Sequence, residues 1–255
     1  MSLQRQADRP LALTQWETLY SFFVRELGLT VELIEPVRGL PDMVFTANAG
    51  IARGDMFISS HFRNKERAGE SPHYEAWFKD RGYIVYTVPQ GCFEGEGDVL
   101  FADPFNAFAG YLIRSDVSAH ARVAELLGVR VVSLELVDPR FYHLDTCFCP
   151  LSADSVVYYP GAFDSYAREV IRENFADCIE VTEEEAGQFV CNAVVVGTHY
   201  VQAEGGRNNL RPALEDRGYT VHEFGMSEFI KAGGATKCLV LKLEKPPEVR
   251  KGYAA

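Results

Sequence analysis

A unit of the same kind recurs five times along this chain of 255 residues, and the repeat constrains the fold more than any other feature. In each unit an amphipathic stretch precedes a short strand rich in β-branched residues, and a polar motif then leads into a hydrophobic hairpin. Gly introduces the strand in every unit except the fourth. The strands lie in ELGLTVELIEP (26–36), DRGYIVYTVP (80–89), LLGVRVVSLEL (126–136), NFADCIEVTEE (174–184) and DRGYTVHEFG (216–225).

Acidic residues, His and Cys gather in the polar motifs. These motifs are PDMVFTANAG (41–50), FEGEGDVLF (93–101), FYHLDTCFCPL (141–151), FVCNAVVVG (189–197) and IKAGGATKCLVLKL (230–243). A unit that cannot bury its own apolar face must stack on copies of itself. Five units around one axis predict an α/β fold, a closed five-bladed α/β propeller with pseudo-fivefold repeats. The motifs would then converge on the axis.

Helical spacing of apolar residues predicts five helices, with Asn208 or Asn209 as the cap of the last and Pro212 in its first turn. The runs MFIS, DVLF, SVVYY, NAVVVG and CLVLKL are too apolar for exposed strands, so they should be buried on both faces. The expected helices span 13–27, 64–81, 116–127, 163–176 and 207–217.

Composition is consistent with one compact domain over residues 1–255, because 47% of the residues are hydrophobic and no Pro/Ser/Gly-rich linker interrupts the chain. No run approaches the roughly 18 apolar residues of a membrane span, and the N-terminal residues lack an apolar signal core. We therefore expect a cytoplasmic protein whose six Cys are reduced thiols. The net charge of −11 disfavours nucleic acid and anionic membranes as partners and favours a cationic ligand, although solubility alone also explains it. A homo-oligomer is allowed.

Cys238 is the first candidate for chemistry, since Gly233 and Gly234 precede it and permit positive φ or a close approach of a ligand. A nucleophilic thiol needs a base or a positive neighbour, and His143 is the best partner. Asp145 would share one side of an extended strand with His143. Taken singly, the Cys is more often a small buried hydrophobe and the His a satisfied core residue.

The second motif places Glu94, Glu96 and Asp98 between glycines, and three such acids cannot all be buried without a positive partner or a proton. A cationic substrate would supply that charge, and the clustered carboxyl groups should have raised pKa values. The alternatives are a calcium-like loop, which would need more oxygen ligands, or an exposed acidic turn. A metal site at Cys147 and Cys149 with His143 and Asp145 is disfavoured, because zinc ligands usually come as separated pairs.

These motifs, in this order, resemble those of the guanidino-group modifying superfamily, which includes arginine deiminases, dimethylarginine dimethylaminohydrolases, amidinotransferases and arginine dihydrolases. The resemblance covers nearly the whole chain and implies a five-bladed α/β propeller. The family's members carry a further strand before the first helix, where this chain opens almost at once with that helix. Part of one blade is therefore expected to be missing or wrongly started.

The resemblance also implies roles for individual residues. Cys238 matches the nucleophile and His143 the general acid and base. Glu94 matches the carboxylate that partners the histidine, although EGEGD departs from the commoner Glu-Gly-Gly-Asp and leaves Glu96 as the alternative. The positions implied to bind substrate are Asp42, Phe45, Asn48, Asp98 and Asp145.

The implied activity is Cys-dependent hydrolysis of the guanidino group of arginine or a methylated arginine, through a covalent amidino-thioether and without a metal or organic cofactor. The substrate is then a small cationic guanidino compound. Asn48 replaces an aspartate of arginine deiminases and places the chain nearest the arginine dihydrolases, which would take arginine past citrulline to ornithine. The alternatives are an amidinotransferase and, in another class, a propeller that binds without catalysis.

Overall fold

The computed structural model describes residues 7–243, and in this part of the chain the hydrophobic hairpins build four three-stranded sheets. In each sheet two antiparallel strands form the hairpin, a helix follows, and the third strand pairs in parallel with the second. A parallel strand requires a crossover connection, which the helix provides. The sheets are β1 Gly50–Arg53, β2 Met56–Ser59 and β3 Ile84–Thr87; β4 Val99–Phe101, β5 Asn106–Tyr111 and β6 Arg130–Glu135; β7 Phe148–Pro150, β8 Ser155–Tyr158 and β9 Asp177–Glu180; and β10 Val194–Val196, β11 His199–Ala203 and β12 Thr220–Phe224.

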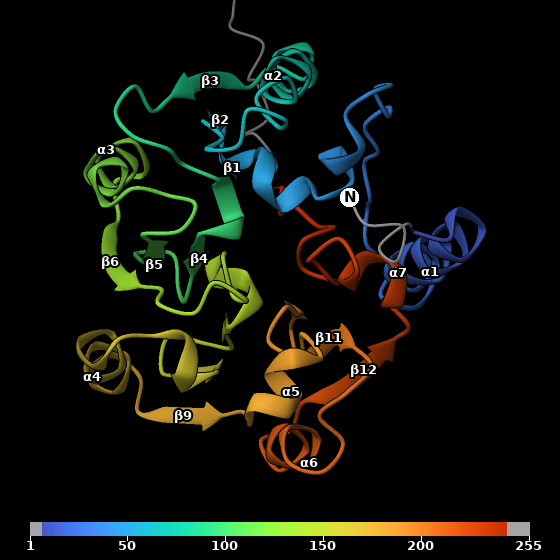
Figure 1. The fold of residues 1–255 in the computed structure, drawn as a ribbon, viewed down its shortest axis with the longest axis vertical. Helices are drawn as coiled ribbons and strands as arrows, with labels where there is room; N and C mark the ends of the chain where they lie inside the picture. The colour runs from blue at the N-terminus through green and yellow to red at the C-terminus, as the bar shows by residue number, and fades with distance from the viewer. Residues whose placement is uncertain (1–6, 244–255) are drawn as a thin grey trace, which may run out of the picture.

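The four sheets of this α/β fold are arranged around a common centre, with helices on the outside of the ring (Figure 1). The second hairpin strand is the middle strand of each sheet and is the most deeply covered. Phe57 and Ile58 in β2 and Val156 and Val157 in β8 are fully buried. The expectation that these apolar runs are buried on both faces is therefore confirmed for them.

Five helices lie close to their predicted positions. Helix α2 begins at Ser71 rather than at residue 64, because Pro72 fits the first helical turn and not the interior of a longer helix. Asn209 occupies the predicted cap position of α6, but its side chain makes no capping hydrogen bond. These helices are α1 Arg9–Ser21, continued by a π-helical turn over Phe22–Glu26, α2 Ser71–Asp80, α3 Val117–Leu127, α4 Ser165–Asn174 and α6 Leu210–Glu215.

Two short helices were not predicted. Helix α5 (Glu183–Gly187) begins with a capping box, in which the Thr182 side chain and the Glu185 side chain each accept a main-chain N–H. Helix α7 (Ser227–Ile230) precedes the Cys238 segment and has a single turn. Both are too short to produce a clear helical period.

The fifth unit differs from the prediction within the described residues. Neither 26–36 nor 238–243 forms a strand, because neither pairs with another strand. Leu29 and Val31 instead pack against an apolar cluster that contains Leu239, so the apolar pattern reflects burial without a sheet. The fifth unit therefore combines an early segment of the chain with a late one, and α1 lies beside α7 (Figure 1). The terminal residues 1–6 and 244–255 lie outside the described part.

The first three polar motifs contain short 3-10 turns, which contact one another near the centre of the ring (Figure 1). The Ala47 N–H donates to the Cys238 carbonyl oxygen at 3.1 Å, which ties the first motif to the last. Gly95, at φ +61°, lies so close to the first motif that a Cβ atom would be 2.6 Å from the Gly50 nitrogen. None of the helices in residues 7–243 combines the length and apolar character that crossing a membrane requires.

Candidate active site

Cys238 follows a tight segment whose two glycines are sterically required. Gly233 has φ +93°, and a Cβ atom there would lie 2.2 Å from the Tyr142 hydroxyl oxygen. A Cβ atom at Gly234 would lie 2.7 Å from the Phe45 ring. The Tyr142 hydroxyl donates to the Gly233 carbonyl oxygen at 2.7 Å and holds the segment in place. The positive φ expected of this Gly-Gly pair is present at Gly233.

The Cys238 thiol is buried between a carboxylate and an amide. It donates to Asp145 Oδ2 at 3.3 Å and accepts a hydrogen bond from Asn192 Nδ2 at 3.1 Å. Burial, and then the negative charge of Asp145, raise the pKa of the Cys238 thiol well above its usual value. These surroundings favour the protonated thiol, and a positive charge beside the sulfur would favour the thiolate.

Asn192 was not singled out by the sequence, yet it makes four hydrogen bonds at the nucleophile. Besides the thiol, its Nδ2 donates to the Asp145 carbonyl oxygen at 3.0 Å. Its Oδ1 accepts from the main-chain N–H groups of Ala235 at 3.1 Å and Cys238 at 3.2 Å. One signal for it was available in the sequence. Asn192 is the polar residue of FVCNAVVVG, and it precedes the apolar run just as the polar residues of the other motifs precede theirs.

His143 and Glu94 form a buried pair, with His143 Nε2 2.7 Å from Glu94 Oε2. Glu94 also accepts from the Arg63 N–H at 3.1 Å and from Arg114 Nη1 at 3.2 Å. Burial opposes ionisation of Glu94, but the hydrogen bond and charge of His143 and the charge of Arg114 outweigh it and lower its pKa to about 2. Burial likewise lowers the pKa of His143, but Asp98 and Glu94 raise it above the usual value. Both pKa shifts favour the charged forms of the pair, an imidazolium and a carboxylate.

Glu96 lies apart from His143 and has a different partner. Its carboxylate accepts from Lys237 Nζ at 2.8 Å and from the Lys242 N–H at 3.3 Å. The Glu96–Lys237 ion pair is buried on both sides. The geometry therefore associates Glu94, and not Glu96, with the histidine.

The other two acids also differ from each other. Asp98 accepts from the Ser115 hydroxyl at 2.6 Å and from the Leu144 N–H at 3.1 Å, and burial raises its pKa to about 6. Burial also raises the pKa of Asp145, and its Oδ1 has no hydrogen-bond partner among the described residues. The expectation of raised carboxyl pKa values holds for these two, whereas it is wrong for Glu94 because cations surround that carboxylate.

The first motif contributes Asn48, which is buried beside a cation. Asn48 Oδ1 accepts from Arg67 Nη1 at 2.8 Å, and its Nδ2 is buried without a hydrogen-bond partner in the described residues. Arg67 is held by Glu70 at 2.9 and 2.8 Å and by the Asp42 carbonyl oxygen at 3.1 Å. An amide donor therefore remains available beside a buried positive charge.

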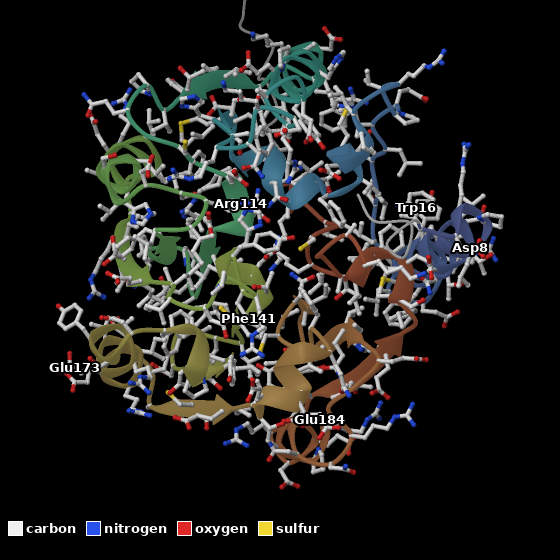
Figure 2. The ribbon with its side chains drawn as sticks, in the orientation of Figure 1. Asp8, Trp16, Arg114, Phe141, Glu173 and Glu184 are labelled. Atoms are coloured by element: carbon white, nitrogen blue, oxygen red, sulfur yellow. The ribbon has the colours of Figure 1, made fainter. Side chains whose placement is uncertain are left out.

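One pocket collects most of these groups. Arg114, which lies on the inner side of the ring in Figure 2, has its guanidinium 4.6 Å from the centre of the Tyr142 ring. Arg67, Arg114 and Tyr142 were not predicted, because they belong to connections between elements. The pocket is lined by Asp42, Phe45, Asn48, Asn64, Arg67, Arg114, Tyr142, His143, Ala232, Gly233, Gly234 and Cys238.

This arrangement can bind a molecule that is cationic at one end and anionic at the other. Asp145 is the negative group beside the thiol, Glu94 lies behind His143, and Asn48 supplies an amide to the pocket that Cys238 lines. Arg114 and Arg67 add positive charge to the same pocket. A thiol, an imidazolium and unpaired polar atoms around one cavity are suited to covalent chemistry on a planar cation.

The metal alternative at Cys147 and Cys149 has no support in the described residues. The Cys147 thiol donates to the Leu144 carbonyl oxygen at 3.6 Å and the Cys149 thiol to the Ala193 carbonyl oxygen at 3.7 Å. Residues 7–243 contain no group of three His, Cys, Asp or Glu side chains placed to hold a metal ion. Both thiols are packing groups in the core.

Comparison with known proteins identifies relatives of this chain. The chain is 45% identical over 245 residues to the bifunctional arginine dihydrolase/ornithine cyclodeaminase ArgZ of Synechocystis sp., covering 94% of this chain and 34% of that protein. It is 42% identical over 246 residues to the N(G),N(G)-dimethylarginine dimethylaminohydrolase of Mycobacterium tuberculosis, covering 95% of this chain and 79% of that protein. The chain thus spans about a third of the length of the bifunctional relatives that it matches.

A solved structure has the same fold. The N-terminal domain of ArgZ, in a variant covalently bound to a reaction intermediate, matches with a TM-score of 0.90 and 43% identity, covering 94% of this chain and 89% of that one. The family described as N,N dimethylarginine dimethylhydrolase, eukaryotic, matches residues 1–245. The chain therefore belongs to the N,N dimethylarginine dimethylhydrolase family.

Proposed function

We propose that this chain is a cysteine-dependent hydrolase that removes nitrogen from the guanidino group of arginine. The observation that carries the proposal is that Cys238 and His143 line one pocket. Behind them, Asp145 accepts from the Cys238 thiol and Glu94 forms an ion pair with His143. The relatives ArgZ and AgrE, both named bifunctional arginine dihydrolase/ornithine cyclodeaminases, and the covalent intermediate of ArgZ support it.

Substrate binding would activate the nucleophile. Asp145 Oδ1 is an unused buried acceptor, so a guanidinium N–H can donate to it and satisfy it. The added positive charge favours the Cys238 thiolate over the thiol, because an opposite charge within about 4–6 Å stabilises an ionised group. The thiol proton is released to solvent as the cationic substrate binds, and the sulfur attacks the guanidinium carbon to form a tetrahedral adduct.

His143 would then act first as an acid and later as a base. Glu94 keeps it protonated, so the imidazolium gives its proton to the departing nitrogen, which leaves as ammonia. The neutral imidazole next takes a proton from water, and the hydroxide adds to the amidino carbon. Collapse of this adduct breaks the C–S bond and releases citrulline, and the hydroxyl proton passes to the departing sulfur and restores the thiol. Every step uses only the side chains already described.

The remaining side chains of the pocket would recognise the amino-acid end of arginine. We assign the carboxylate to Arg114, which is partly exposed in the pocket and not saturated by Glu94. Asp42 lines the same pocket and would accept from the α-amino group, while Phe45 would cover the aliphatic stem. Asp98 does not line the pocket, so its proposed role is to hold the His143 segment through the Leu144 N–H.

Asn48 favours a second round of hydrolysis. Its Nδ2 is a buried donor without a partner, and a neutral ureido oxygen is a suitable acceptor for it. Cys238 can attack the ureido carbon of citrulline bound in this way, and hydrolysis of the resulting adduct by water yields ornithine, a second ammonia and carbon dioxide, which carries away the ureido carbon. The reaction proposed for the chain is therefore arginine and two waters to ornithine, carbon dioxide and two ammonia molecules.

Hydrolysis of dimethylarginine is the second candidate, since the matching family and the Mycobacterium tuberculosis relative carry that activity in their names. Incubation with arginine, citrulline, agmatine and asymmetric dimethylarginine, with detection of ammonia, dimethylamine, citrulline and ornithine, separates the two. We expect ammonia and ornithine from arginine. Faster release of dimethylamine from dimethylarginine, with citrulline left unchanged, would reject the dihydrolase assignment.

For the fold we propose one domain over residues 1–255 that closes as a five-bladed propeller. Four blades would be the four sheets, and the fifth would combine α1 and residues 29–36 with the Cys238 segment. Packing of Leu29 and Val31 against the cluster that contains Cys238 and Leu239 supports this assignment. A guanidino compound is the proposed partner, and the proposed location is the cytoplasm.

A further inference from the structure

Asn192 makes contacts at the nucleophile that the proposed reaction does not yet use. It is fully buried at the start of the fourth hairpin and touches Cys238 at both its sulfur and its main-chain nitrogen. We infer that Asn192 is a positioning residue that fixes the Cys238 sulfur and stabilises its thiolate form. The inference rests on the proposed function and adds to it a donor for the nucleophile.

The orientation of the Asn192 amide is set by its own hydrogen bonds. Oδ1 accepts two main-chain N–H groups, from Ala235 and Cys238, so the oxygen cannot exchange places with the nitrogen. Nδ2 has two hydrogens, and its acceptors are the Asp145 carbonyl oxygen and the Cys238 sulfur. One N–H is therefore directed at the sulfur in every arrangement that satisfies the amide.

The Asn192 N–H offsets the effect of the Asp145 carboxylate on the Cys238 sulfur. Asp145 lies 3.3 Å from the thiol and disfavours the thiolate, whereas an N–H donor favours it. Because Asn192 is buried, its hydrogen bond to a charged sulfur is stronger than the same bond in water. Hydrogen bonds from Asn192 and the Ala235 N–H lower the pKa of Cys238 against the effects of burial and Asp145.

The main chain of Asn192 also anchors the nucleophile segment, which supplies a control. The Thr236 hydroxyl lies 2.5 Å from the Asn192 carbonyl oxygen and 3.1 Å from the Val201 carbonyl oxygen, and these two acceptors share its hydrogen. The Lys237 N–H donates to the same Asn192 carbonyl oxygen at 3.2 Å. Replacing Thr236 by Val removes an anchor of the segment without removing the donor to the sulfur. The two roles of Asn192 can therefore be tested separately.

The test is alkylation of Cys238 by iodoacetamide between pH 7 and 10, followed at the Cys238 peptide by mass spectrometry in the full chain. The thiolate sulfur forms a bond to carbon and iodide leaves, so the rate follows the thiolate fraction. Loss of a hydrogen bond to a charged group raises the pKa of the Cys238 thiol by about one to two units. Since a more basic thiolate is also more nucleophilic, the net slowing for Asn192→Ala is about 3- to 10-fold at each pH.

The variants separate donation to the Cys238 sulfur from structural anchoring of the Cys238 segment, because the two roles predict opposite changes in the alkylation rate. We expect Asn192→Asp, which keeps an acceptor for both N–H groups but loses the donor, to slow alkylation at least as much as Asn192→Ala, and Thr236→Val to leave the rate unchanged. A purely structural role predicts a looser segment and faster alkylation. Equal or faster alkylation in folded Asn192→Asp, or equal slowing by Thr236→Val, would overturn the inference. Because no guanidino substrate is used, the result stands even if the proposed activity fails.

Discussion

Replacing Glu94 by Gln separates the two glutamates of EGEGD, which the sequence leaves as alternatives. The change keeps the size of the side chain but removes the charge 2.7 Å from His143 Nε2. Without that charge the pKa of His143 falls, and less imidazolium is present at neutral pH to protonate the leaving nitrogen. Loss of a general acid typically lowers the rate by about 10²- to 10⁴-fold, and we expect a decrease of that size.

The same substitution has a measurable effect on stability. The pKa of Glu94 is lowered from 4.5 to about 2, and a difference of that size is equivalent to about 3 kcal/mol. Because the folded-state pKa is lowered, this stabilisation is complete above pH 4.5 and is lost as the pH falls towards about 2. The free energy of unfolding of Glu94→Gln should therefore fall less over this pH range than that of the unmodified chain.

Glu96→Gln is the matched control. It weakens the buried pair with Lys237, so we expect a loss of about 1.5–3 kcal/mol of stability but a rate per folded molecule close to that of the unmodified chain. The assay combines initial rates of ammonia release from arginine with urea unfolding followed by circular dichroism. Retention of more than a tenth of the rate by Glu94→Gln, or loss of activity in folded Glu96→Gln, would refute the reasoning.

Three further outcomes follow from the site. Cys238→Ser should abolish turnover and leave the circular dichroism spectrum unchanged, and substantial residual ammonia release would exclude the covalent route. His143→Ala should lower kcat by about 10²- to 10⁴-fold at saturating arginine, and an unchanged kcat contradicts its role as acid and base. Asn48→Asp should make citrulline accumulate, since a carboxylate lacks the N–H that a ureido oxygen needs. Ornithine formed at the original rate by Asn48→Asp, measured by chromatography, would remove that role.

The sequence by itself determined the repeat and the chemical character of the motifs. It also predicted five strand-bearing units, four of which form sheets in the described residues. These features depend on local patterns: alternating and β-branched apolar runs pack between neighbours, and glycine is needed where φ is positive, as at Gly233. The resemblance carried by the ordered motifs then implied Cys238 and His143 as the reactive pair. The family match over residues 1–245 is consistent with that order.

Tertiary structure alone decided which polar groups meet. Glu94 and Glu96 have the same residue type and similar neighbours in the sequence, but the turn at Gly95 directs one to His143 and the other to Lys237. In the same way, 26–36 has a strand-like pattern but no partner strand to pair with in the described residues.

Arg67 and Arg114 could not be identified from local patterns, and the place of Asn192 in its motif did not reveal its partner, because these roles depend on contacts with residues far away in the chain. Asn192 reaches Cys238 across 46 positions, and Arg114 reaches Glu94 across 20. Side-chain periodicity reports only which face of an element is buried. Which charges and donors share a pocket is set by how the units close around the centre, since that closure fixes the distances on which hydrogen bonds and pKa values depend.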